Sequence, residues 1–195
     1  MSRGFGPLVF NPEGNYDKNW IEYDARQNIL ESLAVARDLF DHIVIATWKT
    51  EIDLSPFFDV VSLDRLHIVQ ITEDSFLSEM AKKGIHKYHQ VKTTQSGLEL
   101  LSKLGCDVVA KIRTDHGLNL DLLHNEVLRH SNRNPMALGV PNLNLFEIDR
   151  LTDFYFVGNV EIVQTICAKY LSTPQVCDDV HSDYFYKFAT TFSDE

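Results

Sequence analysis

In Cys106-Asp-Val-Val-Ala-Lys-Ile-Arg-Thr-Asp-His116, strand-forming residues give way abruptly to charge. The run from Asp107 to Ile112 favours a buried strand, because valine and isoleucine are enriched in strands. The charged residues that follow cannot stay unpaired in a core, and Gly117 permits a turn directly after them. Open α/β sheets place ligand sites at the carboxyl ends of their strands. The stretch therefore predicts a central strand that ends at a candidate site.

The totals describe an acidic chain that is long enough for one domain, with 195 residues and a formal net charge of −10. This charge argues against nucleic acid as the main partner, because phosphate backbones attract clustered Lys and Arg. A phosphorylated small molecule is still compatible, since one metal ion and a few cations suffice locally. No apolar run has the length of a transmembrane segment, and the N-terminus lacks the apolar core of a secretory signal. We expect a cytoplasmic protein, and leave open a peripheral association with the inner face of a membrane.

The cysteines are odd in number and have no Cys-x-x-Cys spacing. Cys106, Cys167 and Cys177 are therefore interpreted as buried thiols in a reducing compartment. A disulfide framework or a zinc site is not expected.

Helical and strand-like patterns alternate along the whole chain. Strand-like runs lie at 8–10, 42–47, 60–61, 67–71, 107–112, 137–140 and 154–157. Helical or turn-like periodicity covers 20–40, 53–58, 76–84, 89–104, 118–130, 160–171 and 178–188. This alternation predicts one α/β domain over residues 1–195, with a mostly parallel sheet flanked by helices. Gly105 stands where the helix over 89–104 should stop.

The charged end of the central strand has two interpretations. Asp115 is a candidate ligand for magnesium or manganese, which prefer carboxylate oxygen and often take their other ligands from phosphates and water. Alternatively, Arg113 and Asp115 form a surface ion pair. Spacing alone does not separate the two interpretations.

Two further polar clusters also have a functional and a structural interpretation. Tyr88-His-Gln-Val-Lys-Thr-Thr-Gln95 begins a helix, where the dipole attracts phosphate and where Lys92 and His89 would add charge. The structural alternative is a solvated first turn with Thr caps. Asp178-Asp-Val-His-Ser-Asp183 could supply a general base or complete a metal site. The alternative here is a charged helix start.

Other motifs with known chemistry are absent from the sequence. It has no Gly-rich phosphate loop, no Gly-x-Ser-x-Gly elbow and no His-Glu-x-x-His pair. His42, His67 and His130 stand in ordinary strand or helix positions, and we expect them to be structural.

The order of several short motifs resembles the WavE-like lipopolysaccharide-synthesis glycosyltransferases. The elements that carry the resemblance are Ser32-Leu33, Arg37, Ile43-Val-Ile-Ala-Thr-Trp48, Gln90, Thr93-Thr94, Gly97-Leu98, Lys111-Ile-Arg-Thr-Asp115 and Asp153-Phe-Tyr-Phe-Val-Gly158. They cover most of residues 6 to 186 in a consistent order. The most specific elements are Thr-Trp and Lys-Ile-Arg-Thr-Asp.

The resemblance implies a GT-A glycosyltransferase domain, Rossmann-like, that binds a nucleotide-diphosphate sugar and a glycan or glycolipid acceptor. Asp115 would hold Mn²⁺ or Mg²⁺, and His181 of the 178–183 cluster could complete the metal site. If the reaction inverts the anomeric centre, Asp183 would be the catalytic base, with Asp153 and Asp179 as rivals. The expected donor-binding residues are Gly6, Pro7, Thr47, Trp48, His89, Gln90, Lys92, Thr94, Arg113 and Thr114.

Two departures from the family pattern affect these expectations. Arg113 stands where such enzymes carry the first acid of an Asp-x-Asp motif. Tyr88-His89-Gln90 stands where the family has Asn-Arg-Gln, so the phosphate-contacting Arg is lost or replaced by His89 or Lys92. The alternatives are a non-catalytic domain that binds sugar nucleotides or glycans, and a sugar nucleotidyltransferase.

Overall fold

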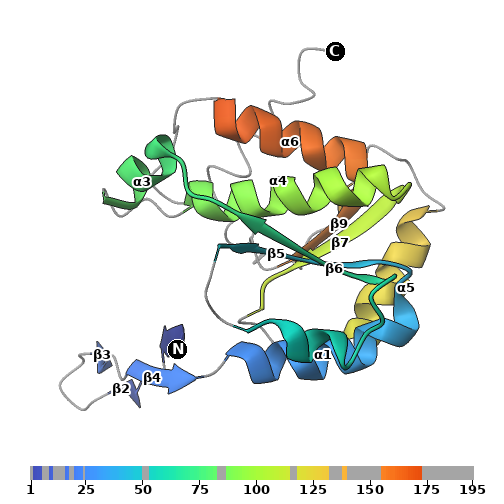
Figure 1. Cartoon of the computed structure of the whole chain (residues 1–195), viewed down its shortest axis with the longest axis horizontal. Helices are drawn as coiled ribbons and strands as arrows, with labels where there is room; N and C mark the ends of the chain where they lie inside the picture. The colour runs from blue at the N-terminus through green and yellow to red at the C-terminus, as the bar shows by residue number, and fades with distance from the viewer. Residues whose placement is uncertain are drawn as a thin grey trace.

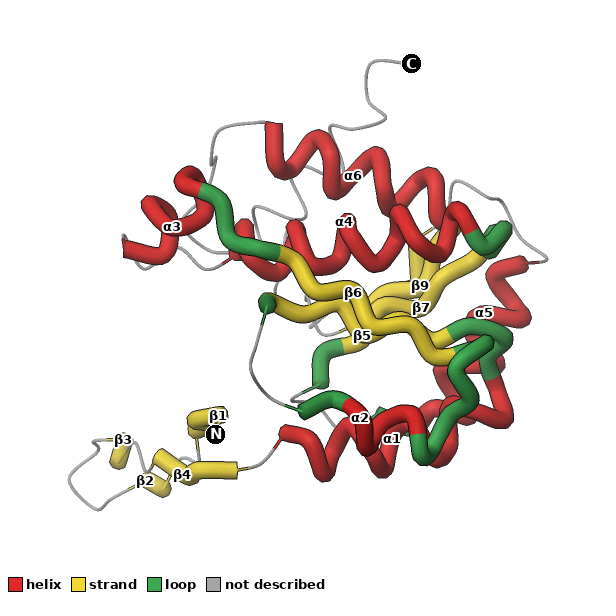
Figure 2. Tube along the Cα trace, viewed as in Figure 1, coloured by secondary structure: helices red, strands yellow, loops and turns green. Residues whose placement is uncertain are grey.

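A β layer lies between two layers of helices (Figure 1). The computed structural model describes residues 2–5, 9–10, 16–17, 20–23, 25–49, 53–82, 87–114, 118–131, 138–139 and 155–172. Its helices are α1 (Ala25–Leu39), α2 (Ser55–Phe58), α3 (Ser75–Lys82), α4 (Lys87–Lys103), α5 (Leu120–Ser131) and α6 (Val160–Ser172). Helices α4 and α6 cover one face of the β layer, and α1, α2 and α5 lie on the other (Figure 2).

The β layer consists of two small sheets. Strands β5 (Ile43–Trp48) and β6 (Leu66–Ile71) form a parallel pair. The second sheet has the order β7-β9-β8 and comprises β7 (Val108–Ile112), β8 (Leu138–Gly139) and β9 (Tyr155–Asn159). Near the N-terminus, antiparallel pairs join β1 (Ser2–Phe5) to β4 (Trp20–Tyr23) and β2 (Val9–Phe10) to β3 (Tyr16–Asp17).

The expected mixed α/β architecture is confirmed, but the described strands do not form one mostly parallel sheet. Strand β9 runs antiparallel to both of its neighbours. Strand direction depends on how the chain connects successive strands, and a short apolar run carries no information about it. The finer expectation of a single Rossmann-like sheet therefore stays a prediction.

Two local predictions were wrong. Residues 20–23 form β4, and the helix expected from residue 20 begins only at Ala25. Pairing with β1 overrides the helical spacing there, as tertiary context often does. Residues 60–61, expected as a strand, continue the turn after α2, because the N–H groups of Val60 and Val61 donate to the Phe57 carbonyl. The helix expected over 178–188 lies outside the described residues.

Side chains next to the helices fix several of their ends. Asn159 Oδ1 accepts the Glu161 N–H at 2.9 Å at the start of α6, and Asp74 Oδ1 accepts the Leu77 N–H at 2.9 Å in α3. Helix α4 ends at Lys103, and Gly105, whose φ is +79°, lies in the turn that follows, as predicted. The N–H of Gly105 donates to Ser102 and that of Cys106 to Leu101, a pairing that glycine favours because it lacks a Cβ.

Alternating residues of β5 serve opposite faces of the layer. Ile43 and Ile45 pack with α1 and α2, whereas Val44 and Ala46 face α4. A Cβ added to Gly97 of α4 would lie 3.5 Å from the Ala46 Cβ, so glycine allows a close approach of the helix. Helix α4 also packs against β7 and α6, and thus spans both sheets.

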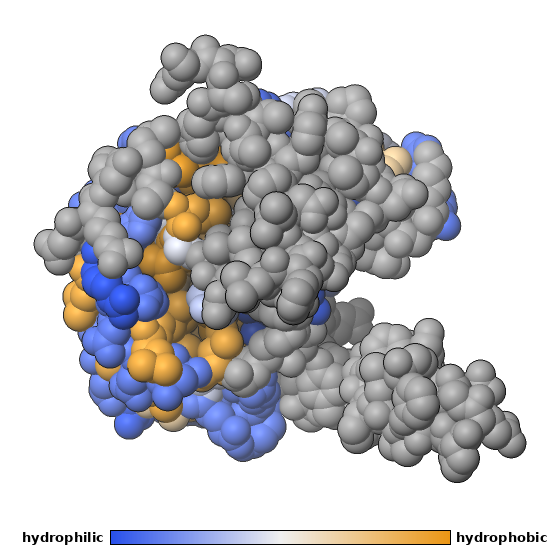
Figure 3. All heavy atoms as spheres, turned by 180° about the vertical axis from the view of Figure 1, so that it is seen from behind, coloured by the Kyte–Doolittle hydropathy of each residue, from blue (hydrophilic) through white to orange (hydrophobic). Residues whose placement is uncertain are grey.

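In the described part of the chain, no helix is both long enough and apolar enough to cross a membrane. Seen from behind, apolar side chains gather in a band with hydrophilic ones at its margins (Figure 3). Val35 of α1 and Leu122 and Leu128 of α5 are exposed large hydrophobic residues. Scattered exposure of this kind is normal for a folded protein and indicates no site by itself.

Candidate functional site

The ends of β5 and β7 and the start of α4 lie at one edge of the β layer (Figure 1). Helix α4 runs antiparallel to β5, because His89 contacts Trp48 whereas Gly97, eight residues later, contacts Ala46 and Val44. The chain then turns at Gly105 and returns as β7, parallel to β5. These directions place the carboxyl ends of β5 and β7 at the same edge of the β layer.

His89 is held from two sides in the first turn of α4. Its Nε2 lies 2.7 Å from Oε1 of Glu73, which follows β6, and its ring meets Trp48 edge-on with centroids 5.0 Å apart. The side chain of His89 is 16% exposed and that of Glu73 is 42% exposed. When His89 is protonated, this contact is an ion pair. The imidazole nitrogen Nε2 is thus engaged by a carboxylate in the structure.

Gln90 lies on the face of α4 that packs on the sheet. It precedes Gly97 by seven residues, or about two turns, which places it on the same side of the helix. This spacing corresponds to about 10 Å of helix, so Gln90 is level with the end of β5 near Trp48. Its Nε2 is buried and has no hydrogen-bond partner among the described residues. An amide donor of this kind is suited to an oxygen acceptor of a ligand.

The other polar side chains at the start of α4 are bonded within the helix. The hydroxyls of Thr93 and Thr94 both donate to the Gln90 carbonyl at 2.9 Å. Lys92 Nζ donates to Gln95 Oε1 at 3.1 Å. An ammonium has three N–H donors, so Lys92 can also contact an anion, while Thr94 retains only acceptor capacity in this rotamer.

Thr47 and Trp48 point to opposite faces of β5. Trp48 packs with the cluster under α4, and Thr47 follows Ile43 and Ile45 in the alternation that faces α1. Thr47 and Trp48, both expected to bind the donor, therefore lie on opposite faces of the sheet and do not form one surface.

At the end of β7, the backbone is tied to α1. Asn28 Nδ2 donates to the carbonyl oxygen of Thr114, the residue that precedes Asp115. Arg113, also predicted to face the nucleotide, lies between β7 and Thr114 and is half-buried. Sequence patterns did not identify Asn28 as part of this edge. Glu73 was also missed, although an acid just after a strand was a usable signal.

Several predicted site residues lie outside the described ranges. They are Gly6, Pro7, Asp115, Asp153, Asp179, His181 and Asp183. Their assignments therefore stay predictions. Within the described ranges, no group of three or more His, Cys, Asp or Glu side chains could hold a metal ion.

The thiol of Cys167 is buried in the core formed by residues of α4 and α6, and it is not reactive at neutral pH. Burial raises its pKa to about 12, although the nearby Lys111 ammonium acts in the opposite direction. Lys111 Nζ also lies 5.4 Å from the centroid of the Phe156 ring. Because the thiolate is the nucleophile, Cys167 is no candidate for nucleophilic catalysis at neutral pH. The predicted burial is confirmed for Cys167, whereas Cys106 is only half-buried and Cys177 lies outside the described residues.

Comparisons with protein-family models, curated proteins and solved structures give no significant match to this chain. The resemblance to the WavE-like glycosyltransferases rests on the motifs quoted above.

Proposed function

We propose that this chain is a metal-dependent glycosyltransferase with a GT-A-like domain. It would transfer a sugar from a nucleotide-diphosphate donor to a hydroxyl of a glycan or glycolipid acceptor. One observation carries the proposal: Trp48 and the Glu73–His89 pair meet where β5 and β6 end, and β7 ends at the same edge of the β layer (Figure 1). Such an edge is where open α/β sheets bind nucleotides.

The start of α4 is the proposed contact for the donor diphosphate. The positive end of the helix dipole favours an anion there, and Lys92 adds an ammonium. The buried Nε2 of Gln90 supplies a neutral donor close to Trp48. His89 contributes positive charge when protonated, but its Nε2 contacts Glu73. We therefore assign the direct diphosphate contacts to Lys92 and Gln90, and a supporting charge to His89.

The proposed metal ligands are Asp115 and His181. A carboxylate oxygen completed by phosphate and water oxygens suits Mn²⁺ or Mg²⁺. The hydrogen bond from Asn28 to Thr114 fixes the backbone directly before Asp115, which favours a well-placed ligand. When bound, the ion would offset the charge that develops on the leaving diphosphate. Arg113, in place of the usual first acid, would add positive charge beside the nucleotide.

Proton transfer is assigned to an acid in the later part of the chain. If the reaction inverts the anomeric centre, a carboxylate must take the proton of the acceptor hydroxyl as the sugar transfers. We propose Asp183 for this role, with Asp153 and Asp179 as rivals. Asp183→Asn should abolish transfer and leave donor binding intact, whereas unaffected turnover would remove the assignment.

A thermal-shift panel of nucleotide sugars, measured with and without Mn²⁺, tests the proposal. A donor that binds the folded state raises the melting temperature, and the Mn²⁺-dependent part of that rise should disappear in Asp115→Ala. Asp121→Ala, which alters an exposed acid in α5, is the matched control and should behave as wild type. A rise that is identical with and without metal would contradict the metal-dependent site, and the absence of any rise would contradict donor binding.

The reaction product separates the alternatives. Release of a nucleoside diphosphate supports the transferase. Release of pyrophosphate would indicate a nucleotidyltransferase, and binding without turnover would indicate a non-catalytic domain.

A further inference from the structure

Two histidines face each other at the edge of the β layer opposite the proposed donor site. His42 directly precedes β5, and His67 is the second residue of β6. The Nδ1 of His42 lies 3.3 Å from the Nε2 of His67, with ring centroids 5.4 Å apart and the planes inclined by 44°. Both side chains are half-buried. No motif had suggested more than a structural role for either residue.

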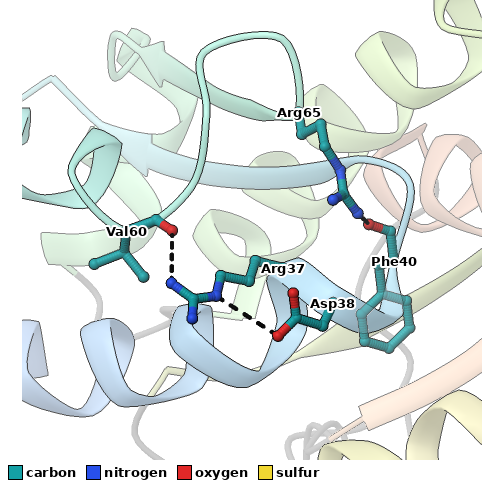
Figure 4. A network of polar contacts seen from close by, with 5 residues as sticks. All are labelled: Arg37, Asp38, Phe40, Val60 and Arg65. Atoms are coloured by element: carbon teal, nitrogen blue, oxygen red, sulfur yellow. Dashed lines mark hydrogen bonds and ion pairs between the residues drawn. The ribbon is translucent and has the colours of Figure 1, made fainter.

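The parallel pairing of β5 and β6 brings the two rings together. Val44 is opposite His67, and His42 precedes Val44 by two residues, so both histidines extend from the same face of the sheet. Arg65 reinforces this arrangement, because its guanidinium donates to the carbonyl of Phe40 (Figure 4) and also to that of Asp41. These bonds tie the segment before His42 to the start of β6. The relative position of the rings is thus set by backbone structure on both strands.

We propose that Nδ1 of His42 and Nε2 of His67 bind a divalent transition-metal cation such as Zn²⁺ or Cu²⁺. Imidazole nitrogen is a preferred ligand of these ions. With metal–nitrogen bonds of about 2.0–2.1 Å and tetrahedral geometry, two ligating nitrogens stand about 3.3–3.4 Å apart. The observed separation of 3.3 Å matches this value. The two nitrogens already have the spacing of two ligands of a tetrahedral ion such as Zn²⁺. Cu²⁺ prefers tetragonal geometry, in which neighbouring nitrogens lie closer together, so it serves here as a spectroscopic probe.

Metal binding requires a change of tautomer and a reorientation of the rings, because the two lone pairs must point at the ion and not at the facing ring. Without metal, one of the two facing nitrogens carries the proton of the ring–ring hydrogen bond. When the ion binds, that proton moves by exchange with water to the other nitrogen of the same ring, and both imidazoles stay neutral. Asp64, whose carboxylate is close enough to His42 for an electrostatic interaction, adds negative potential, which the neighbouring Arg65 guanidinium offsets in part.

The site is open. Within the described ranges, no third His, Cys, Asp or Glu side chain joins the pair as a ligand, so water would occupy the remaining positions. An ion held by two protein ligands exchanges more readily than one in a closed structural zinc site. The chemistry also differs from that of the proposed Mn²⁺ or Mg²⁺ site, which uses carboxylate oxygen at the opposite edge. The two proposals are independent.

Titration of the metal-free full chain with Cu²⁺ and with Zn²⁺, followed by calorimetry, tests the inference. We expect binding to weaken by at least about tenfold in His42→Gln and in His67→Gln, since loss of even an outer-shell partner acts on that scale. His124→Gln removes an imidazole on α5 and should bind as wild type. Equal binding in wild type and both variants, or no binding by wild type, would overturn the site.

Two further measurements keep the result interpretable. Circular dichroism establishes that the variants are folded, and the electron paramagnetic resonance spectrum of the Cu²⁺ complex should show coupling to two nitrogens in wild type. Coupling to a single nitrogen in wild type would contradict a shared site. Mn²⁺-dependent nucleotide binding should be the same in His42→Gln as in wild type, because the two sites lie at opposite edges.

Discussion

The ring of His89 lies edge-on against Trp48, with their centroids 5.0 Å apart, and this contact joins the first turn of α4 to the end of β5. Glu73 closes the arrangement from the end of β6 through its 2.7 Å contact with His89. Three segments that are separate in sequence thus meet at one imidazole. The charge of this cluster depends on the Glu73 carboxylate and the His89 ring. Conservative substitutions of these two residues can therefore change that charge one group at a time.

Glu73→Gln and His89→Gln should change anion binding in opposite directions. Removing the carboxylate lessens repulsion, so Glu73→Gln should bind pyrophosphate several-fold more tightly, whereas His89→Gln should bind it more weakly. The pair is partly exposed, so each change should lower the free energy of unfolding by no more than about 1 kcal/mol. Calorimetry with pyrophosphate and urea unfolding measure both effects. Glu99→Gln, at an exposed position of α4, is the control; weaker binding by Glu73→Gln would contradict the assignment.

Asn28→Asp should disturb the edge of β7 without changing the shape of the side chain. The variant loses the N–H donor to the Thr114 carbonyl and places an acceptor against it. We expect a loss of about 0.5–1.5 kcal/mol in the free energy of unfolding. Under the proposed function, Mn²⁺-dependent nucleotide affinity should also fall, because the backbone before Asp115 is released. Gln27→Ala, at the exposed neighbouring position, should leave that affinity unchanged.

Alanine should have opposite effects at two glycines. Gly105 has φ of +79°, so Gly105→Ala should cost about 1–2 kcal/mol, even though the added Cβ has open space. At Gly97, the new Cβ would make ordinary contacts with Val44 and Ala46, and alanine is favoured in a helix by about 0.5–1 kcal/mol. Chemical denaturation of the two variants measures the difference. A stabilised Gly105→Ala would show that the helix end can relax.

The pH dependence of stability should include a term from Cys167. Its thiol has a pKa of about 12 in the folded protein, against an ordinary value of 9.0 in the unfolded chain. The folded state therefore retains a proton that the unfolded state releases, and stability should fall as pH rises from about 9 to 12. Comparing wild type with Cys167→Ala over this range isolates the term. A thiol reagent at pH 8 should react with half-buried Cys106 before Cys167.

Much of the architecture followed from local pattern. The runs at Ile43–Trp48 and Val108–Ile112 and the helix ending before Gly105 were predicted within a few residues. In each case, side-chain spacing and end signals agree with the tertiary environment. The edge at which the candidate site lies was predicted from the same pattern. The charged residues that end a buried strand must lie at the edge of the sheet, because burying them unpaired in the core is unfavourable.

What could not be predicted depends on contacts between distant segments. The antiparallel direction of β9 is set by its connection, and β4 is a strand because it pairs with β1. The roles of Glu73 and Asn28 arise from partners 16 and 86 residues away. The facing of His42 and His67 likewise depends on the register of two strands. None of these relationships leaves a periodic signal in the sequence.

The position of β9 constrains when this chain can fold during synthesis. It lies between β7 and β8, yet it is made after both. Helix α6, which follows it, supplies the buried Val163, Cys167 and Tyr170 to the core under α4. A growing chain therefore presents unpaired strand edges and an uncovered apolar helix face until residue 172 has left the ribosome tunnel. Chaperone binding to nascent chains should accordingly persist until α6 emerges and then fall sharply.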